Sequence, residues 1–173
     1  QDTDVRWQKM FREGRKMLVE TIDYLSGFAP VDILIVPGNH DEQTSFYLGD
    51  ALEAWYHNND NVSVNNTATS RKYYKYHNNL IAFTHGDKEK HADLPLIMAT
   101  EAPELWAQCS NREFIIGHLH TNRTTNRIVT DENRGVQIII MPSIAGTDAW
   151  HSGKAYVNNK KLGVARIYSK NGL

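Results

Sequence analysis

The chain has 173 residues, of which 40% are hydrophobic and 23% are charged, as expected for a globular domain with its own core. A formal net charge of −1 excludes a global basic field for nucleic acid or an anionic membrane, although a local basic patch is compatible with it. The single cysteine excludes a disulfide framework within the chain, which favours a cytoplasmic protein, and no apolar run approaches the about 20 residues that span a bilayer. We therefore expect one domain over residues 1–173 and no membrane partner.

The first half of the chain alternates between helical and strand patterns. Apolar residues near a 3.6-residue period predict an amphipathic helix over Asp4–Gly27. The β-branched run Val31–Val36 has the length and composition of a buried strand. A second helix is predicted over Ser45–Tyr56, and a short strand over Val62–Val64.

Hairpins dominate the second half. Two strands, Tyr73–His77 and Leu80–Thr84, are predicted to turn at Asn78-Asn79. The elements predicted after them are a helix over Leu96–Ala107 broken at Pro103, a strand over Glu113–Ile116, a hairpin of Thr124–Thr130 and Val136–Met141 turning at Asp131–Gly135, and a last strand over Gly163–Ser169. The whole pattern predicts an α/β fold, with a mixed sheet or two packed sheets flanked by helices.

Three predicted strands are each followed by side chains that can bind a metal: Asn39-His40-Asp41, His85-Gly86-Asp87 and His118-Leu119-His120. If these strands share a sheet and a direction, their carboxyl ends converge on one site. His118 and His120 are two residues apart, so in extended chain both point the same way. Imidazole suits Zn²⁺, Mn²⁺, Fe or Ni²⁺, and amide and carboxylate oxygens favour the harder ions among these. For Asn39–Asp41 alone, a capped turn before a helix is an equally good interpretation.

Together these segments resemble the calcineurin-like metallophosphoesterase family. The matching motifs, in order, are Gly38-Asn39-His40-Asp41, Thr84-His85-Gly86-Asp87 and Gly117-His118-Leu119-His120. The similarity continues through Met141-Pro142-Ser143 and Gly146–Trp150, which resemble a phage or bacterial branch of the family. It therefore covers most of the chain from Val31 onward.

The resemblance implies a β-sandwich flanked by helices, with two divalent ions at one end. It also implies that four side chains hold these ions: Asn39, His85 and His118 the second ion, and His120 the first. By the same resemblance, His40 protonates the leaving oxygen of the substrate, and Asp41 orients its imidazole. Mn²⁺ is the expected ion, with Zn²⁺, Fe or Ni²⁺ as alternatives.

The implied activity is metal-dependent hydrolysis of phosphate esters by metal-activated water. Phosphodiesters are the expected substrates in a nuclease-like reaction, so DNA or RNA is an expected partner. Phosphomonoesters or phosphoproteins are the alternative substrates. A non-catalytic scaffold that binds metal or nucleic acid is the alternative from another class. Asp87 and His91 are candidate substrate contacts, and Arg71–Tyr76 mixes basic and aromatic residues as single-strand binders do.

The sequence departs from the family pattern before Gly38. The family's first two strands carry Asp-x-His and Gly-Asp; no Asp-x-His occurs here, and both Gly49-Asp50 and Gly86-Asp87 lie after Gly38. We therefore expect the carboxyl-terminal part of a longer enzyme, with one metal ion or fewer and little activity of its own. Its uncovered strand edge is expected to pair with a second copy or with a retained amino-terminal peptide. A relic that binds without hydrolysing is the alternative.

Overall fold

The computed structural model describes residues 6–118, 129–142, 144 and 162–172. The chain forms two compact units, Gln1–Thr69 (unit 1) and Ser70–Leu173 (unit 2), which are described separately below. The expected single domain over 1–173 stays a prediction. Within the described ranges, no helix has the length and apolar character needed to cross a membrane.

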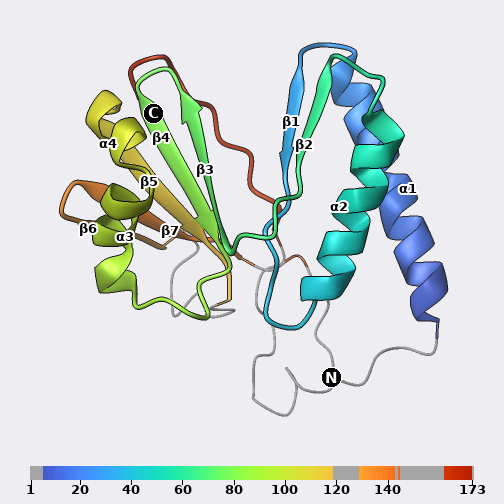
Figure 1. The fold of residues 1–173 in the computed structure, drawn as a ribbon, viewed down its shortest axis with the longest axis horizontal. Helices are drawn as coiled ribbons and strands as arrows, with labels where there is room; N and C mark the ends of the chain where they lie inside the picture. Colours follow the sequence, from blue (N-terminus) through green and yellow to red (C-terminus); the bar gives the residue numbers. More distant parts are fainter. Residues whose placement is uncertain (1–5, 119–128, 143, 145–161, 173) are drawn as a thin grey trace. The chain divides into compact units, whose positions relative to one another are not determined.

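Unit 1 is a helix followed by a β-α-β unit (Figure 1). Its elements are α1 (Trp7–Ser26), β1 (Val31–Leu34), α2 (Glu42–Tyr56) and β2 (Val62–Asn65). Strands β1 and β2 are parallel, because α2 returns the chain to the starting end of the sheet. All four elements were predicted, and no end is displaced by more than three residues.

The core of unit 1 lies between the two helices and one face of its sheet. Ile33 on β1 is paired with Val64 on β2, and both pack against buried side chains of α1 and α2. The Tyr56 hydroxyl joins the helices, since it donates to the Val19 carbonyl (3.2 Å) or the Asp23 carboxylate (2.9 Å). Burial and this carboxylate raise the pKa of Tyr56 above its usual range. Strand β1 is half-buried rather than fully buried as predicted, because a two-stranded sheet leaves much of its surface open.

Unit 2 is built on a five-stranded mixed sheet with the order β3-β4-β5-β7-β6. Its elements are β3 (Arg71–Tyr76), β4 (Asn79–Thr84), the short 3₁₀ helix η1 (His91–Asp93), α3 (Leu94–Glu101), α4 (Pro103–Gln108), β5 (Asn111–Ile116), β6 (Val129–Asn133) and β7 (Val136–Ile140). The central strands β4, β5 and β7 are parallel, and the edge strands β3 and β6 are antiparallel to their neighbours. This arrangement is consistent with a metallophosphoesterase-like α/β fold, and it brings the carboxyl ends of three strands to one edge.

The core of unit 2 is one face of this sheet, covered by α3 and α4 (Figure 1). Phe114 on β5 is fully buried and packs edge-on against Tyr73 of β3, with ring centroids 6.3 Å apart. Leu94 and Met98 of α3, together with Cys109, close the core over the strands. Strand β4 is buried at five of its six positions, as expected for a strand inside the sheet with both neighbours present.

Two hairpin turns differ slightly from those predicted. The β3–β4 turn is His77-Asn78 rather than Asn78-Asn79, and His77 has the positive φ of 49° that favours a tight two-residue hairpin. The β6–β7 turn is Arg134-Gly135, because β6 continues to Asn133. The part of the predicted first strand before Val129 lies outside the described residues.

The predicted strand Gly163–Ser169 is wrong. In the described part of this segment the only backbone pairing is an isolated bridge between Ser169 and Gly172. Side chains hold the segment to the sheet instead: Arg166 pairs with the buried Glu113 at 2.9 Å, and Asn79 donates to the Ser169 carbonyl at 2.9 Å. An alternating pattern in the sequence shows which side chains face the sheet, but not whether the backbone finds a partner.

Candidate metal centre

Two of the predicted metal ligands, His85 and His118, follow neighbouring parallel strands. His85 comes directly after β4, and His118 comes two residues after β5. The pairing of these strands continues one step past their ends, since the Gly117 amide donates to the His85 carbonyl at 3.1 Å. The fold therefore places both imidazoles at the same edge of the five-stranded sheet, as the sequence predicted for this pair.

The two imidazoles face each other. His118 Nδ1 lies 3.2 Å from His85 Nε2, and the ring centroids are 5.0 Å apart at an angle of 71°. Both side chains are half-buried. His118 has a φ of +55°, a left-handed conformation that is strained for any residue other than glycine. The expectation of extended chain at His118 is therefore wrong, and His120 lies outside the described residues.

Gly86 lets the chain turn away from β4 directly after His85. Its φ is +90°, and a Cβ atom at this position would lie 3.3 Å from the Cβ of Ile116. A larger residue would be strained and would press against the end of β5. The glycine of the Thr84-His85-Gly86-Asp87 motif is therefore required by the structure itself.

The imidazole pair fits two positions of a metal coordination shell. Two nitrogen ligands about 2.0–2.1 Å from a tetrahedral ion lie about 3.3 Å from each other, close to the separation of these atoms. Within the described ranges, no group of three or more histidine, cysteine, aspartate or glutamate side chains gathers at one point. The described part of unit 2 therefore holds two candidate nitrogen ligands and not a complete shell.

The third predicted motif, Asn39-His40-Asp41, belongs to unit 1. It follows β1, which lies in a two-stranded sheet apart from β4 and β5, so the expectation that all three strands share one sheet is wrong. The three side chains are exposed. Asp41 Oδ1 accepts the Gly38 amide at 2.8 Å and thereby closes the turn that precedes α2. The predicted turn before a helix is therefore present, but Asp41, the N-cap residue of α2, makes no side-chain capping bond to the helix. The orientation of His40 by Asp41 stays a prediction.

The two candidate substrate contacts lie in the segment after β4. Asp87 is half-buried in the loop that begins at His85, and His91 is the first residue of η1. The 3₁₀ helix is tied to the β6–β7 hairpin, because Asn133 donates to the Ala92 carbonyl at 3.1 Å. This bond places η1 at the β6–β7 turn, the amino end of β7, whereas His85 follows the carboxyl end of the parallel strand β4. The contact of Asp87 and His91 with a substrate stays a prediction.

The basic side chains of Arg71–Tyr76 are engaged within unit 2. Arg71 forms a bidentate pair with Glu101 (2.8 and 2.5 Å) and a further ion pair with Glu89 (2.5 Å). Lys75 donates to Gln108 at 2.5 Å, and Lys72 is buried, which lowers the pKa of its ammonium group. This strand therefore offers little free positive charge to a nucleic acid.

Sequence reasoning missed the Arg71 network. Glu89 and Glu101 are 18 and 30 residues from Arg71, and no local pattern joins them. The bidentate contact with Arg71 holds the pKa of Glu101 below its usual range, and burial and the contact with Glu101 raise that of Tyr73. The pairing of β3 with β4 and the packing of α3 on the sheet bring these groups together.

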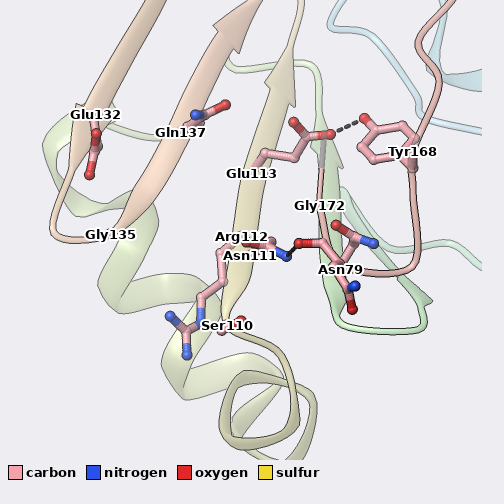
Figure 2. A pocket seen from close by; sticks show the side chains of 11 residues that line it. Asn79, Ser110, Asn111, Arg112, Glu113, Glu132, Gly135, Gln137, Tyr168 and Gly172 are labelled. Carbon is pink, nitrogen blue, oxygen red and sulfur yellow. Dashed lines mark hydrogen bonds between the residues drawn. The ribbon is translucent and has the colours of Figure 1, made fainter.

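A polar pocket lies at the other end of β5 (Figure 2). It has a volume of about 400 Å³ and is lined by residues such as Asn79, Asn111 and Tyr168. Glu113, also in its lining, accepts a hydrogen bond from the Tyr168 hydroxyl. Burial raises the pKa of Glu113, and the nearby Arg166 offsets part of this rise. The pocket lining contains no histidine, so it is not part of the imidazole site.

Comparison with known families agrees with this geometry. A sequence model of the calcineurin-like phosphoesterase family matches residues 3–142. The match covers most of the chain, and the chain therefore belongs to the calcineurin-like phosphoesterase family. The match includes the segments of His40, His85 and His118, and it begins well before Val31, where the motif similarity started. Searches of curated proteins and of solved structures found no match.

Proposed function

We propose that this chain is a metal-dependent phosphoesterase that acts preferentially on phosphodiesters. The observation that carries the proposal is the His85–His118 pair, 3.2 Å apart at the ends of two parallel strands, in a chain of this family. Neutral imidazoles leave the positive charge of a divalent ion uncompensated, so this ligand pair favours an anionic substrate.

Each residue of the proposed site has one role. His85 and His118 hold a divalent ion, Mn²⁺ before Zn²⁺, Fe or Ni²⁺, with Asn39 and His120 as the further proposed ligands. Bound divalent ions neutralise phosphate charge and make water more acidic. The exposed imidazole of His40 donates a proton to the leaving oxygen, which matters most when that oxygen belongs to a poor leaving group.

A non-catalytic metal-binding scaffold is the second candidate. It is favoured by the absence of Asp-x-His from the 173 residues and by the two-ligand site in the described part of unit 2. The same absence makes slow turnover the expected behaviour of an active chain.

A panel of phosphate esters tests the proposed activity. With Mn²⁺ present, we expect the chain to hydrolyse bis(4-nitrophenyl) phosphate faster than 4-nitrophenyl phosphate, and a chelator should stop the reaction. A single-stranded oligonucleotide and a phosphopeptide in the same panel distinguish nuclease from phosphatase action. If the chain binds Mn²⁺ but hydrolyses none of these esters, the scaffold is the better description.

Metal binding tests the ligands directly. Calorimetry should show about one Mn²⁺ or Zn²⁺ bound by the wild-type chain. Loss of a direct ligand in His85→Ala should weaken this binding by at least the about 10–100-fold seen when outer-shell partners are removed. His77→Ala is the matched control, because His77 is an exposed histidine in the β3–β4 turn. Equal affinity in wild type and His85→Ala would remove His85 from the site.

A further inference from the structure

The loop that carries His85 is fastened to the sheet by a buried carboxylate. The Glu89 side chain is only 4% exposed and accepts a hydrogen bond from Arg71 Nη1 at 2.5 Å. The Thr84 hydroxyl lies 3.3 and 3.5 Å from the two Glu89 carboxylate oxygens. A carboxylate this deeply buried is stable only when it is paired, so these contacts define where residue 89 must lie.

The contacts of Glu89 close the loop onto the point where it begins. Thr84 is the last residue of β4, and Arg71 is its partner across the antiparallel β3–β4 ladder. Glu89 therefore returns the chain to the strand end from which His85 leaves. Gly86, directly after His85, turns tightly against Ile116 of β5. His85 thus lies between Thr84, which contacts Glu89, and Gly86, so its backbone has little freedom to move.

We propose that Glu89 is a positioning residue that holds His85 at the distance from His118 required to bind a divalent ion. This inference rests on the proposed function, because it assumes that the two imidazoles are metal ligands. A free loop would have to be ordered when the ion binds, and the cost of ordering it would weaken metal affinity. With Glu89 in place, the loop is already ordered in the folded protein, before the ion binds.

Glu101 provides a matched comparison within the same network. It binds the same guanidinium through two contacts (2.8 and 2.5 Å) and accepts the Tyr73 hydroxyl at 2.7 Å. Glu101 ends α3, however, and its bonds to Arg71 and Tyr73 join it to β3. A purely structural role for the network predicts that Glu101, with two bonds to Arg71 instead of one, matters at least as much as Glu89.

The test compares Glu89→Gln with Glu101→Gln by Mn²⁺ and Zn²⁺ calorimetry on the full chain. We expect Glu89→Gln to lower metal affinity by about 10–100-fold, as outer-shell substitutions do, and Glu101→Gln to leave it unchanged within a few-fold. Imidazole ¹⁵N correlation spectra of the metal-free proteins should show altered His85 and His118 signals in Glu89→Gln only. Thermal unfolding of both variants reports any general loss of structure separately.

Glu89→Asp covers the case in which Glu89→Gln does not fold. It keeps the negative charge near Arg71 but withdraws the carboxylate by one methylene, so metal affinity should fall in the same direction. The positioning role is overturned if Glu89 and Glu101 variants lose affinity equally, or if neither Glu89 variant loses any. His85→Ala in the same series separates the two proposals: if its affinity is unchanged, the metal site itself is wrong, and if only its affinity falls, the site stands without a role for Glu89.

Discussion

Replacing His40 with alanine should lower kcat for phosphodiester hydrolysis by about 10²–10⁴-fold, the usual contribution of a general acid. Metal affinity should change little, since His40 is proposed to act on the leaving oxygen and not to bind the ion. The imidazole is exposed in the turn before α2, so its removal should not disturb the core of unit 1. The two effects together distinguish a proton donor from a ligand.

The leaving group provides the measurement. Rates for a nitrophenyl diester, whose leaving group needs no proton, should fall much less in His40→Ala than rates for an alkyl or nucleoside ester. His57→Ala is the control in the same unit, since His57 is an exposed histidine at the opposite end of α2. A large loss that does not depend on the leaving group, accompanied by weaker Mn²⁺ binding, would make His40 a metal ligand instead.

Replacing Phe114 with alanine should destabilise unit 2 by about 3–5 kcal/mol, the usual cost of removing a buried aromatic ring. Phe114 is fully buried at the centre of the five-stranded sheet and contacts Tyr73 edge-on. The cavity would lie directly beneath α3 and α4, where Leu94 and Met98 pack tightly. The loss is large enough to unfold a marginally stable domain.

Phe28→Ala removes the same side chain from a surface position. Phe28 is 76% exposed and contacts Tyr24 edge-on, so its loss should cost no more than about 0.5–1 kcal/mol. Urea unfolding followed by hydrogen exchange in β4, β5 and β7 reports on unit 2 even if the two units unfold separately. A cost below about 1 kcal/mol for Phe114→Ala would contradict the core described here.

The elements that could be predicted from the sequence are those specified by local pattern. Neighbours within a few residues determine the spacing of apolar residues in α1, the helix break at Pro103 and the β3–β4 hairpin. The strand at Gly163–Ser169 was wrong because its alternation reflects side chains that reach Glu113, and backbone pairing depends on distant residues. The turn at His77-Asn78 was displaced because Asn79 is buried in β4, where its amide is satisfied by two carbonyl groups.

In the candidate site, too, the features set by local pattern could be predicted, and those set by distant contacts could not. His85 and His118 were predicted as neighbours because residues that follow the carboxyl ends of two strands meet when those strands are parallel and adjacent, as β4 and β5 are. The separate sheet of β1 could not be predicted, since strand order is set by contacts far apart in sequence. The left-handed backbone at His118 and the burial of Glu89 likewise depend on packing that local composition does not show.

The position of the single thiol has a practical consequence. Cys109 is 1% exposed in the core of unit 2, and the other unit has no thiol. A thiol reagent can reach it only when this core opens, so the labelling rate measures the opening equilibrium of unit 2 alone. An ion held by His85 and His118 would slow labelling by mass action. Cys109 is therefore a natural probe of how a bound ion affects the opening of unit 2. It needs no engineered label, and unit 1 contributes nothing to the measured labelling.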